Sequence, residues 1–145
     1  MRRAAAGLRR RVGHRGASLL FFGLLDLVYC YSLTIPPPRE RWSPGLAFLD
    51  AIVPLWVWGI AWGAVGLLCL CRSFRRRDAA AFAAAIGIKV LWAIASLAAW
   101  LVGGVERGYV NAAVWLAFAG FVGIIASWPE PVNRKGRPSW TPPLS

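Results

Sequence analysis

Four long apolar blocks limit what this chain can fold into more than any other feature of its sequence. They cover about residues 17–35, 50–71, 79–102 and 109–128. At ~1.5 Å per residue a helix over each block reaches roughly 29 to 36 Å, close to the ~30 Å thickness of a hydrocarbon layer. Of the 145 residues 58% are apolar and only 16% are charged, which excludes an ordinary water-soluble enzyme. The sequence therefore predicts an all-α, polytopic membrane protein with four transmembrane helices in an antiparallel bundle.

Helix-breaking residues and charges mark the connections between the blocks. Three consecutive prolines at 36–38 must end the first helix, because proline has no N–H to donate. Asp50 is expected to cap the second helix, with Pro54 inside its first turn, where it would be tolerated or would cause a kink. The segment 72–78, RSFRRRD, predicts a tight hairpin outside the hydrocarbon, and Gly103 with Gly104 ends the third helix.

Two polar tails flank the predicted transmembrane domain, which covers residues 17–128. Residues 1–16 form a basic tail, and residues 129–145 form a basic, proline-rich tail with too little apolar content to fold alone. A cleaved signal peptide is the alternative interpretation of the N-terminus. We favour an uncleaved anchor, because Asp26 interrupts the first block and the prolines follow it without a small-residue cleavage site.

The distribution of Lys and Arg predicts the orientation. The N-terminal tail, the 72–78 hairpin and the C-terminal tail carry 6, 4 and 3 basic residues, whereas the other two connections carry 2 and 1. Basic segments stay on the cytoplasmic side, and these three share one side only if the chain crosses four times. Both termini are therefore predicted to be cytoplasmic. Arg-rich and Ala-rich composition suggests a bacterial or phage genome, so the expected location is the bacterial cytoplasmic (inner) membrane.

Two charged residues inside the blocks are expected to form an intramembrane ion pair. Asp26 lies nine residues after Ala17, and Lys89 lies ten after Ala79. The two helices run in the same direction, so both side chains are predicted to lie about 14 to 15 Å deep. The pair can simply fix helix packing, or it can line a polar path or switch between paired and separated states. Snorkelling or neutralisation of either group is the remaining alternative.

Small residues in the second and fourth blocks predict close helix packing. The glycines concerned are Gly59, Gly63, Gly66, Gly120 and Gly123. Glycine lets two backbones approach, either within one chain or between two copies. We favour packing within the chain, because each helix already has three neighbours there, and a homo-oligomer is the alternative.

The sequence offers lipid contacts but no catalytic constellation. The densest charge run is Arg72, Arg75, Arg76 and Arg77, and it is expected to contact anionic lipid head groups. Specific nucleic-acid binding is not expected, because basic residues beside apolar blocks are explained by membrane orientation.

His14 is the only histidine, and Cys30, Cys69 and Cys71 lie in apolar blocks as reduced thiols, so neither a metal site nor a disulfide is expected. No nucleophile motif or P-loop is present, so we predict a non-enzymatic protein without a cofactor.

Three segments resemble small four-span membrane proteins of actinobacterial phages. They are DLVYCYSL in the first block, IKVLWAI in the third and the closing run RGYVNAAVWLAFAGFVGIIASWPEP, which covers the whole fourth block. The resemblance implies a phage or prophage context and a holin-like permeabiliser, without an established activity or residue roles. A small transporter or channel component using Asp26 and Lys89 is one alternative, and a membrane adaptor subunit is the other.

The predicted topology can be tested with reporter fusions. Fusions at residue 75 and at the C-terminus should report a cytoplasmic location, whereas fusions near Glu40 and Gly104 should report an external one, because the basic residues favour that orientation. Paired fusions to alkaline phosphatase and to a fluorescent protein at each position distinguish the external from the cytoplasmic location. One position with inverted reporters would contradict the topology.

Overall fold

The computed structural model describes residues 2–74 and 78–128, with side chains from residue 14 onward, and every regular element in these ranges is a helix. The elements are α1 (Arg2–Thr34), the short 3₁₀ turn η1 (Arg39–Arg41), α2 (Pro44–Ile52), α3 (Leu55–Arg72), α4 (Ala79–Leu101) and α5 (Gly108–Ser127). Four of them contain a stretch long and apolar enough to cross a membrane. The predicted all-α class is confirmed, and the chain is a multi-pass integral membrane protein.

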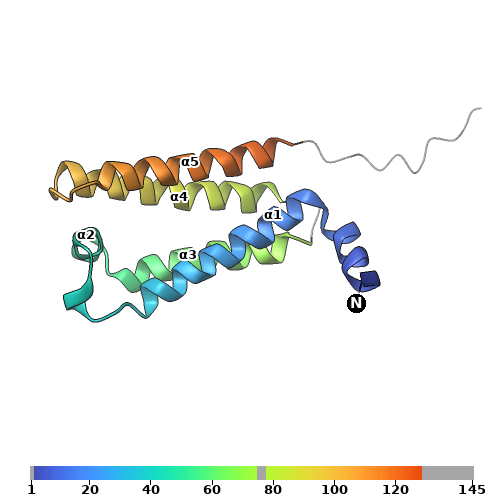
Figure 1. The fold of residues 1–145 in the computed structure, drawn as a ribbon, viewed down its shortest axis with the longest axis horizontal. Coiled ribbons are helices and arrows are strands. Elements are labelled where there is room, and N and C mark those ends of the chain that lie inside the picture. The colour runs from blue at the N-terminus through green and yellow to red at the C-terminus, as the bar shows by residue number, and fades with distance from the viewer. Residues whose placement is uncertain (1, 75–77, 129–145) are drawn as a thin grey trace, which may run out of the picture.

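The four long helices are arranged as two antiparallel pairs (Figure 1). Helix α1 packs mainly on α3, and α4 packs mainly on α5. The two pairs meet over a less extensive interface, formed chiefly by α3 and α4, which we call the seam. The short helix α2 packs on α4 and α3 at the end of the bundle away from the N-terminus. We call that end the α2 end.

Glycines in α3 bring its backbone close to α1. A Cβ added at Gly66 would lie 2.9 Å from the carbonyl oxygen of Gly23, and one at Gly63 would lie 2.8 Å from the Cys30 sulfur. At Gly59 it would lie 2.6 Å from a methyl group of Thr34. Real Cβ atoms do not approach so closely, so a side chain at any of these positions would force a shift. The requirement for glycine is strictest at Gly66, where the close atom belongs to the α1 backbone.

The glycines of the fourth span behave differently. A Cβ at Gly120 would meet nothing within 4 Å, and one at Gly123 would only touch the side chain of Ile86, at 3.9 Å. Gly120 therefore lies on an open face of α5, and packing within the described chain does not explain it.

The second predicted span, 50–71, begins at the wrong residue. The structure ends α2 at Ile52 and begins α3 at Leu55. The reason is Pro54, which disfavours helical geometry in the residue before it, and Val53 is indeed extended, with φ −144° and ψ 129°. Asp50 still acts as a cap, but across this break, because its Oδ1 accepts a hydrogen bond from the Leu55 N–H at 3.0 Å.

Helix α2 itself was not predicted, since residues 36–49 were assigned to a connection. Its start has a recognisable signal, because the Ser43 hydroxyl accepts a hydrogen bond from the Leu46 N–H and Pro44 occupies the first turn. The first predicted span, about 17–35, lies within a longer helix. Helix α1 already begins at Arg2, which fits the high helix propensity of the Ala and Arg residues there. The predicted tail 129–145 lies outside the described residues.

The contrast between the glycines gives a stability prediction. Gly66→Ala should lower the free energy of unfolding by about 1 to 3 kcal/mol, because the new methyl group would press on the α1 backbone. Gly120→Ala is the matched control and should cause no loss, since its methyl group meets open space. Unfolding in bicelles, followed by circular dichroism, measures both. Equal losses at the two positions would contradict the close contact of α1 and α3.

Candidate functional site

The two predicted intramembrane charges contact each other across the seam. The Lys89 Nζ donates a hydrogen bond to Asp26 Oδ1 at 2.8 Å, and both side chains are 0% exposed. Asp26 comes from α1 and Lys89 from α4, so the ion pair joins the two helix pairs. The predicted juxtaposition is thus present, at a point where α1 and α4 otherwise contact each other little.

The ammonium group of Lys89 lies close to two aromatic rings. Its Nζ is 5.8 Å from the centre of the Phe22 ring and 5.2 Å from that of the Trp62 ring. Both distances allow cation–π attraction, which is strongest when the cation is desolvated. Phe22 and Trp62 belong to two different apolar clusters of the core, so the ion pair lies where these clusters meet.

Five aromatic side chains form a layer next to the ion pair on its α2 side. Tyr29 lies one helical turn beyond Asp26, and Trp92 lies one turn beyond Lys89. The layer consists of Tyr29, Trp58, Trp62, Trp92 and Trp115, which come from all four long helices. Tyr29 stacks on Trp62 with ring centres 4.7 Å apart, and Trp115 packs edge-on against both. We call this group the aromatic layer.

Three buried polar atoms at this level have no hydrogen-bond partner among the described residues. They are the second carboxylate oxygen of Asp26, Oδ2, and the indole nitrogens of Trp58 and Trp62. An unsatisfied buried polar atom costs about 1 to 3 kcal/mol, so the polar groups near the ion pair are not all satisfied. The seam is therefore both the place where the helix pairs are joined and the place where buried polarity is least satisfied.

The ion pair constrains the fold because either charge, buried without its partner, would destabilise the bundle. Breaking a buried pair by removing one charge typically costs 3 to 5 kcal/mol, since the other charge stays in a medium of low dielectric constant. Each helix pair therefore requires the other to neutralise its charge.

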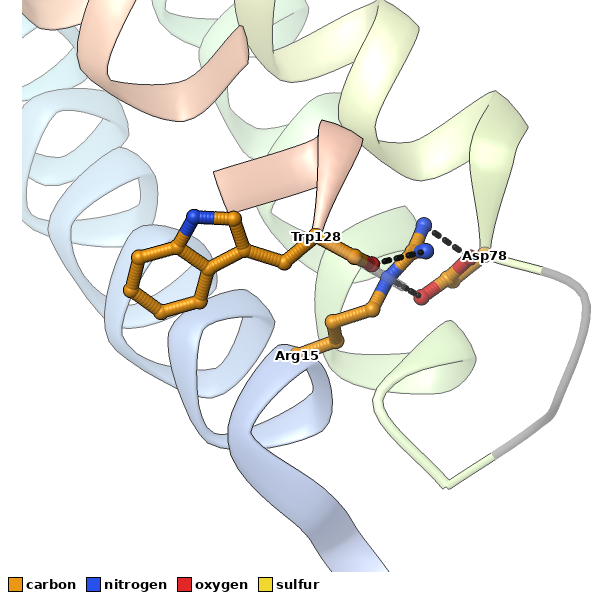
Figure 2. A network of polar contacts seen from close by, with 3 residues as sticks. All are labelled: Arg15, Asp78 and Trp128. Atoms are coloured by element: carbon orange, nitrogen blue, oxygen red, sulfur yellow. Dashed lines mark hydrogen bonds and ion pairs between the residues drawn. The ribbon is translucent and has the colours of Figure 1, made fainter. Parts of the chain in front are cut away.

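A second polar cluster connects three chain segments at the end of the bundle opposite the α2 end. The sequence analysis did not predict it. Figure 2 shows Arg15 of α1 reaching Asp78, at the start of α4, and Trp128, just after α5. The Arg15 guanidinium donates two hydrogen bonds to the Asp78 carboxylate, at 2.9 and 3.0 Å, and a third to the Trp128 carbonyl oxygen, at 3.2 Å. It also lies 5.2 Å from the centre of the Phe82 ring. We call Arg15, Asp78 and Trp128 the clasp.

The sequence contains one signal for the clasp. Asp78 is the acidic residue of an otherwise basic hairpin, and Arg15 is the last Arg before the first apolar block. Sequence alone does not pair them, because 63 residues separate them and Arg15 belongs to the predicted basic tail.

The remaining predicted residues are the arginines of the 72–78 hairpin and the three cysteines. Arg72 lies in the last turn of α3 and interacts within the chain, so it is not a free charge. Arg75, Arg76 and Arg77 lie outside the described residues. Cys30 is half-buried, Cys69 is buried and Cys71 is exposed. Within residues 2–74 and 78–128 no three His, Cys, Asp or Glu residues come together as metal ligands.

The clasp generates a stability prediction. Arg15→Lys should lower the free energy of unfolding by about 1 kcal/mol, because lysine cannot reproduce the bidentate geometry and the carbonyl contact. Arg39→Lys is a matched control, since Arg39 pairs with Asp50 at 3.2 Å but its side chain is 80% exposed. Exposed ion pairs contribute little, so the control should lose much less. Chemical unfolding in bicelles measures both, and equal losses would show that the clasp does not hold the helices.

Comparisons with known protein families, with characterised proteins and with solved structures find no match to this chain. A function therefore has to be inferred from the structure itself. The described features that bear on it are four membrane-spanning helices in two pairs, a buried ion pair on the seam, and a clasp at one end.

Proposed function

We propose that this protein is a non-enzymatic, holin-like permeabiliser of the bacterial cytoplasmic membrane. The observation that carries the proposal is the position of Asp26 and Lys89 on the seam between two helix pairs, rather than inside one pair. In the closed state the two charges neutralise each other. If the pairs separate, the same two charges line the opening and favour water there.

The closed seam is balanced in a way that suits such a transition. The ion pair and the cation–π contacts stabilise it, whereas the three unsatisfied atoms of Asp26, Trp58 and Trp62 destabilise it. An opening that admits water would hydrate all of these groups. Two-state behaviour of packed helix pairs is a common basis for switching.

The phage or prophage context of the proposal is supported by the resemblance of the DLVYCYSL, IKVLWAI and final-span segments. Its non-enzymatic part is supported by the lack of a nucleophile or phosphate-binding motif in the sequence. Assembly into a homo-oligomer is compatible with the open face of α5, where Gly120 would allow close approach of a second copy.

A second candidate function, a small transporter or channel component, is favoured by one observation. A cavity at the α2 end reaches Trp92, which lies one helical turn from Lys89. A solute or proton entering from that end would need to pass only the aromatic layer to reach the ion pair. In this version Asp26 and Lys89 would couple movement to a charge change.

Controlled induction in bacteria, with a potential-sensitive dye, tests the proposal. Asp26→Asn and Lys89→Met should each permeabilise the membrane earlier than the natural chain, because an unpaired buried charge destabilises the closed state by about 3 kcal/mol. The double variant should permeabilise later or not at all, since its seam is uncharged. Glu40→Gln, which removes an exposed charge on η1, should behave like the natural chain.

The other outcomes identify the alternatives. Solute flux into vesicles that Asp26→Asn abolishes, without a collapse of the membrane potential, would support a transporter. A natural chain that leaves the membrane potential intact at every expression level, with no flux, would contradict permeabilisation and leave the adaptor subunit. The amount of each variant in the membrane fraction has to be equal for these comparisons.

A further inference from the structure

A cavity of about 740 Å³ lies at the α2 end, between α2, the end of α4 and the start of α5. Its volume is within the range that holds a small-molecule ligand, roughly 300 to 1,000 Å³. It is separate from the ion pair, because the aromatic residue Trp92 lines it and Lys89 lies a further helical turn away.

The lining of the cavity changes in polarity with depth. Glu106 and Arg107, in the turn between α4 and α5, stand at the level of the helix ends. About one turn further in, Asn111 donates a hydrogen bond to the Ser96 hydroxyl at 2.7 Å. The deepest part includes Trp92, which lies nine residues before the end of α4 and thus ~14 Å inside the span. Leu49 of α2 adds a buried apolar wall.

The charges of Glu106 and Arg107 do not take part in holding the fold together. Neither Glu106 nor Arg107 forms an ion pair or a side-chain hydrogen bond within the described part of the chain. The turn that carries them has left-handed backbone at two positions, since Gly104 and Arg107 both have positive φ, at 61° and 64°. A Cβ at the next residue, Gly108, would lie 2.7 Å from the Ser96 carbonyl oxygen, so the turn is also held close to α4.

We propose that this cavity binds the head group and glycerol region of a zwitterionic phospholipid with a primary amine, of the phosphatidylethanolamine type. Arg107 suits the phosphate, because a guanidinium binds phosphate oxygens well. Glu106 suits the ammonium group, which can donate hydrogen bonds to a carboxylate. The Asn111 and Ser96 pair lies at the depth of the ester groups, and an acyl chain would extend along Leu49 towards Trp92.

The depth of the cavity favours a lipid over a free zwitterion with the same head group. A soluble phosphoethanolamine could satisfy Glu106 and Arg107, but it would leave the apolar surface near Trp92 in contact with water. An acyl chain covers that surface, and each buried CH₂ group favours binding. The adjacent opposite charges also disfavour a purely anionic head group, since Glu106 would repel it. This inference does not depend on whether the protein permeabilises membranes.

Native mass spectrometry of the full chain tests the proposal in mixed micelles with equal amounts of phosphatidylethanolamine, phosphatidylcholine and phosphatidylglycerol. The natural chain should retain one phosphatidylethanolamine, about tenfold in preference to phosphatidylcholine, whose quaternary ammonium cannot donate a hydrogen bond to Glu106. Glu106→Gln should remove this preference. Arg107→Gln should reduce retention of both zwitterionic lipids.

Matched controls at the same end of the molecule are Glu40→Gln and Arg41→Gln, which remove charges outside the cavity and should leave lipid retention unchanged. Preferential retention of phosphatidylglycerol, or equal retention of all three lipids, would overturn the proposal. So would a preference that survives Glu106→Gln. Displacement of the lipid by soluble phosphoethanolamine would assign the site to a free zwitterion instead.

Discussion

The ion pair between Asp26 and Lys89 is the interaction on which the arrangement of this bundle depends. Packing is most extensive within each helix pair, and glycines bring α1 and α3 close together. Each pair nevertheless carries one charge that would be costly in hydrocarbon. Their contact at 2.8 Å offsets part of both costs, so it fixes which faces of the two pairs meet and at what depth.

Other features reinforce the seam at different depths. The clasp at Arg15 holds α1 to the start of α4 and the end of α5 on one side of the ion pair. The aromatic layer closes the seam on the other side and separates the charges from the cavity at the α2 end. The molecule thus combines a firmly tied end with a hollow end, and the buried charges lie between them.

The parts of the structure that the sequence predicted are those governed by simple physical rules. The four long helices could be predicted from the span lengths and from the positions of proline and glycine. The contact of Asp26 with Lys89 could be predicted from their matched depth in the two helices. Sequence reasoning did not find α2, because a nine-residue helix is stabilised by packing on α3 and α4 more than by its own pattern. It also did not pair Arg15 with Asp78, since contacts between distant segments depend on the three-dimensional arrangement. Gly120 matched a packing pattern but faces outward.

A thermodynamic double-mutant cycle tests the central role of the ion pair most directly. The free energy of unfolding in bicelles is measured for the natural chain, Asp26→Asn, Lys89→Met and the double variant, and the coupling energy follows from the four values. Each single change should cost on the order of 3 kcal/mol, and the double change should recover much of that loss, because no buried charge then remains unpaired. If the two single losses simply add in the double variant, Asp26 and Lys89 do not stabilise each other, and the seam is held by something else.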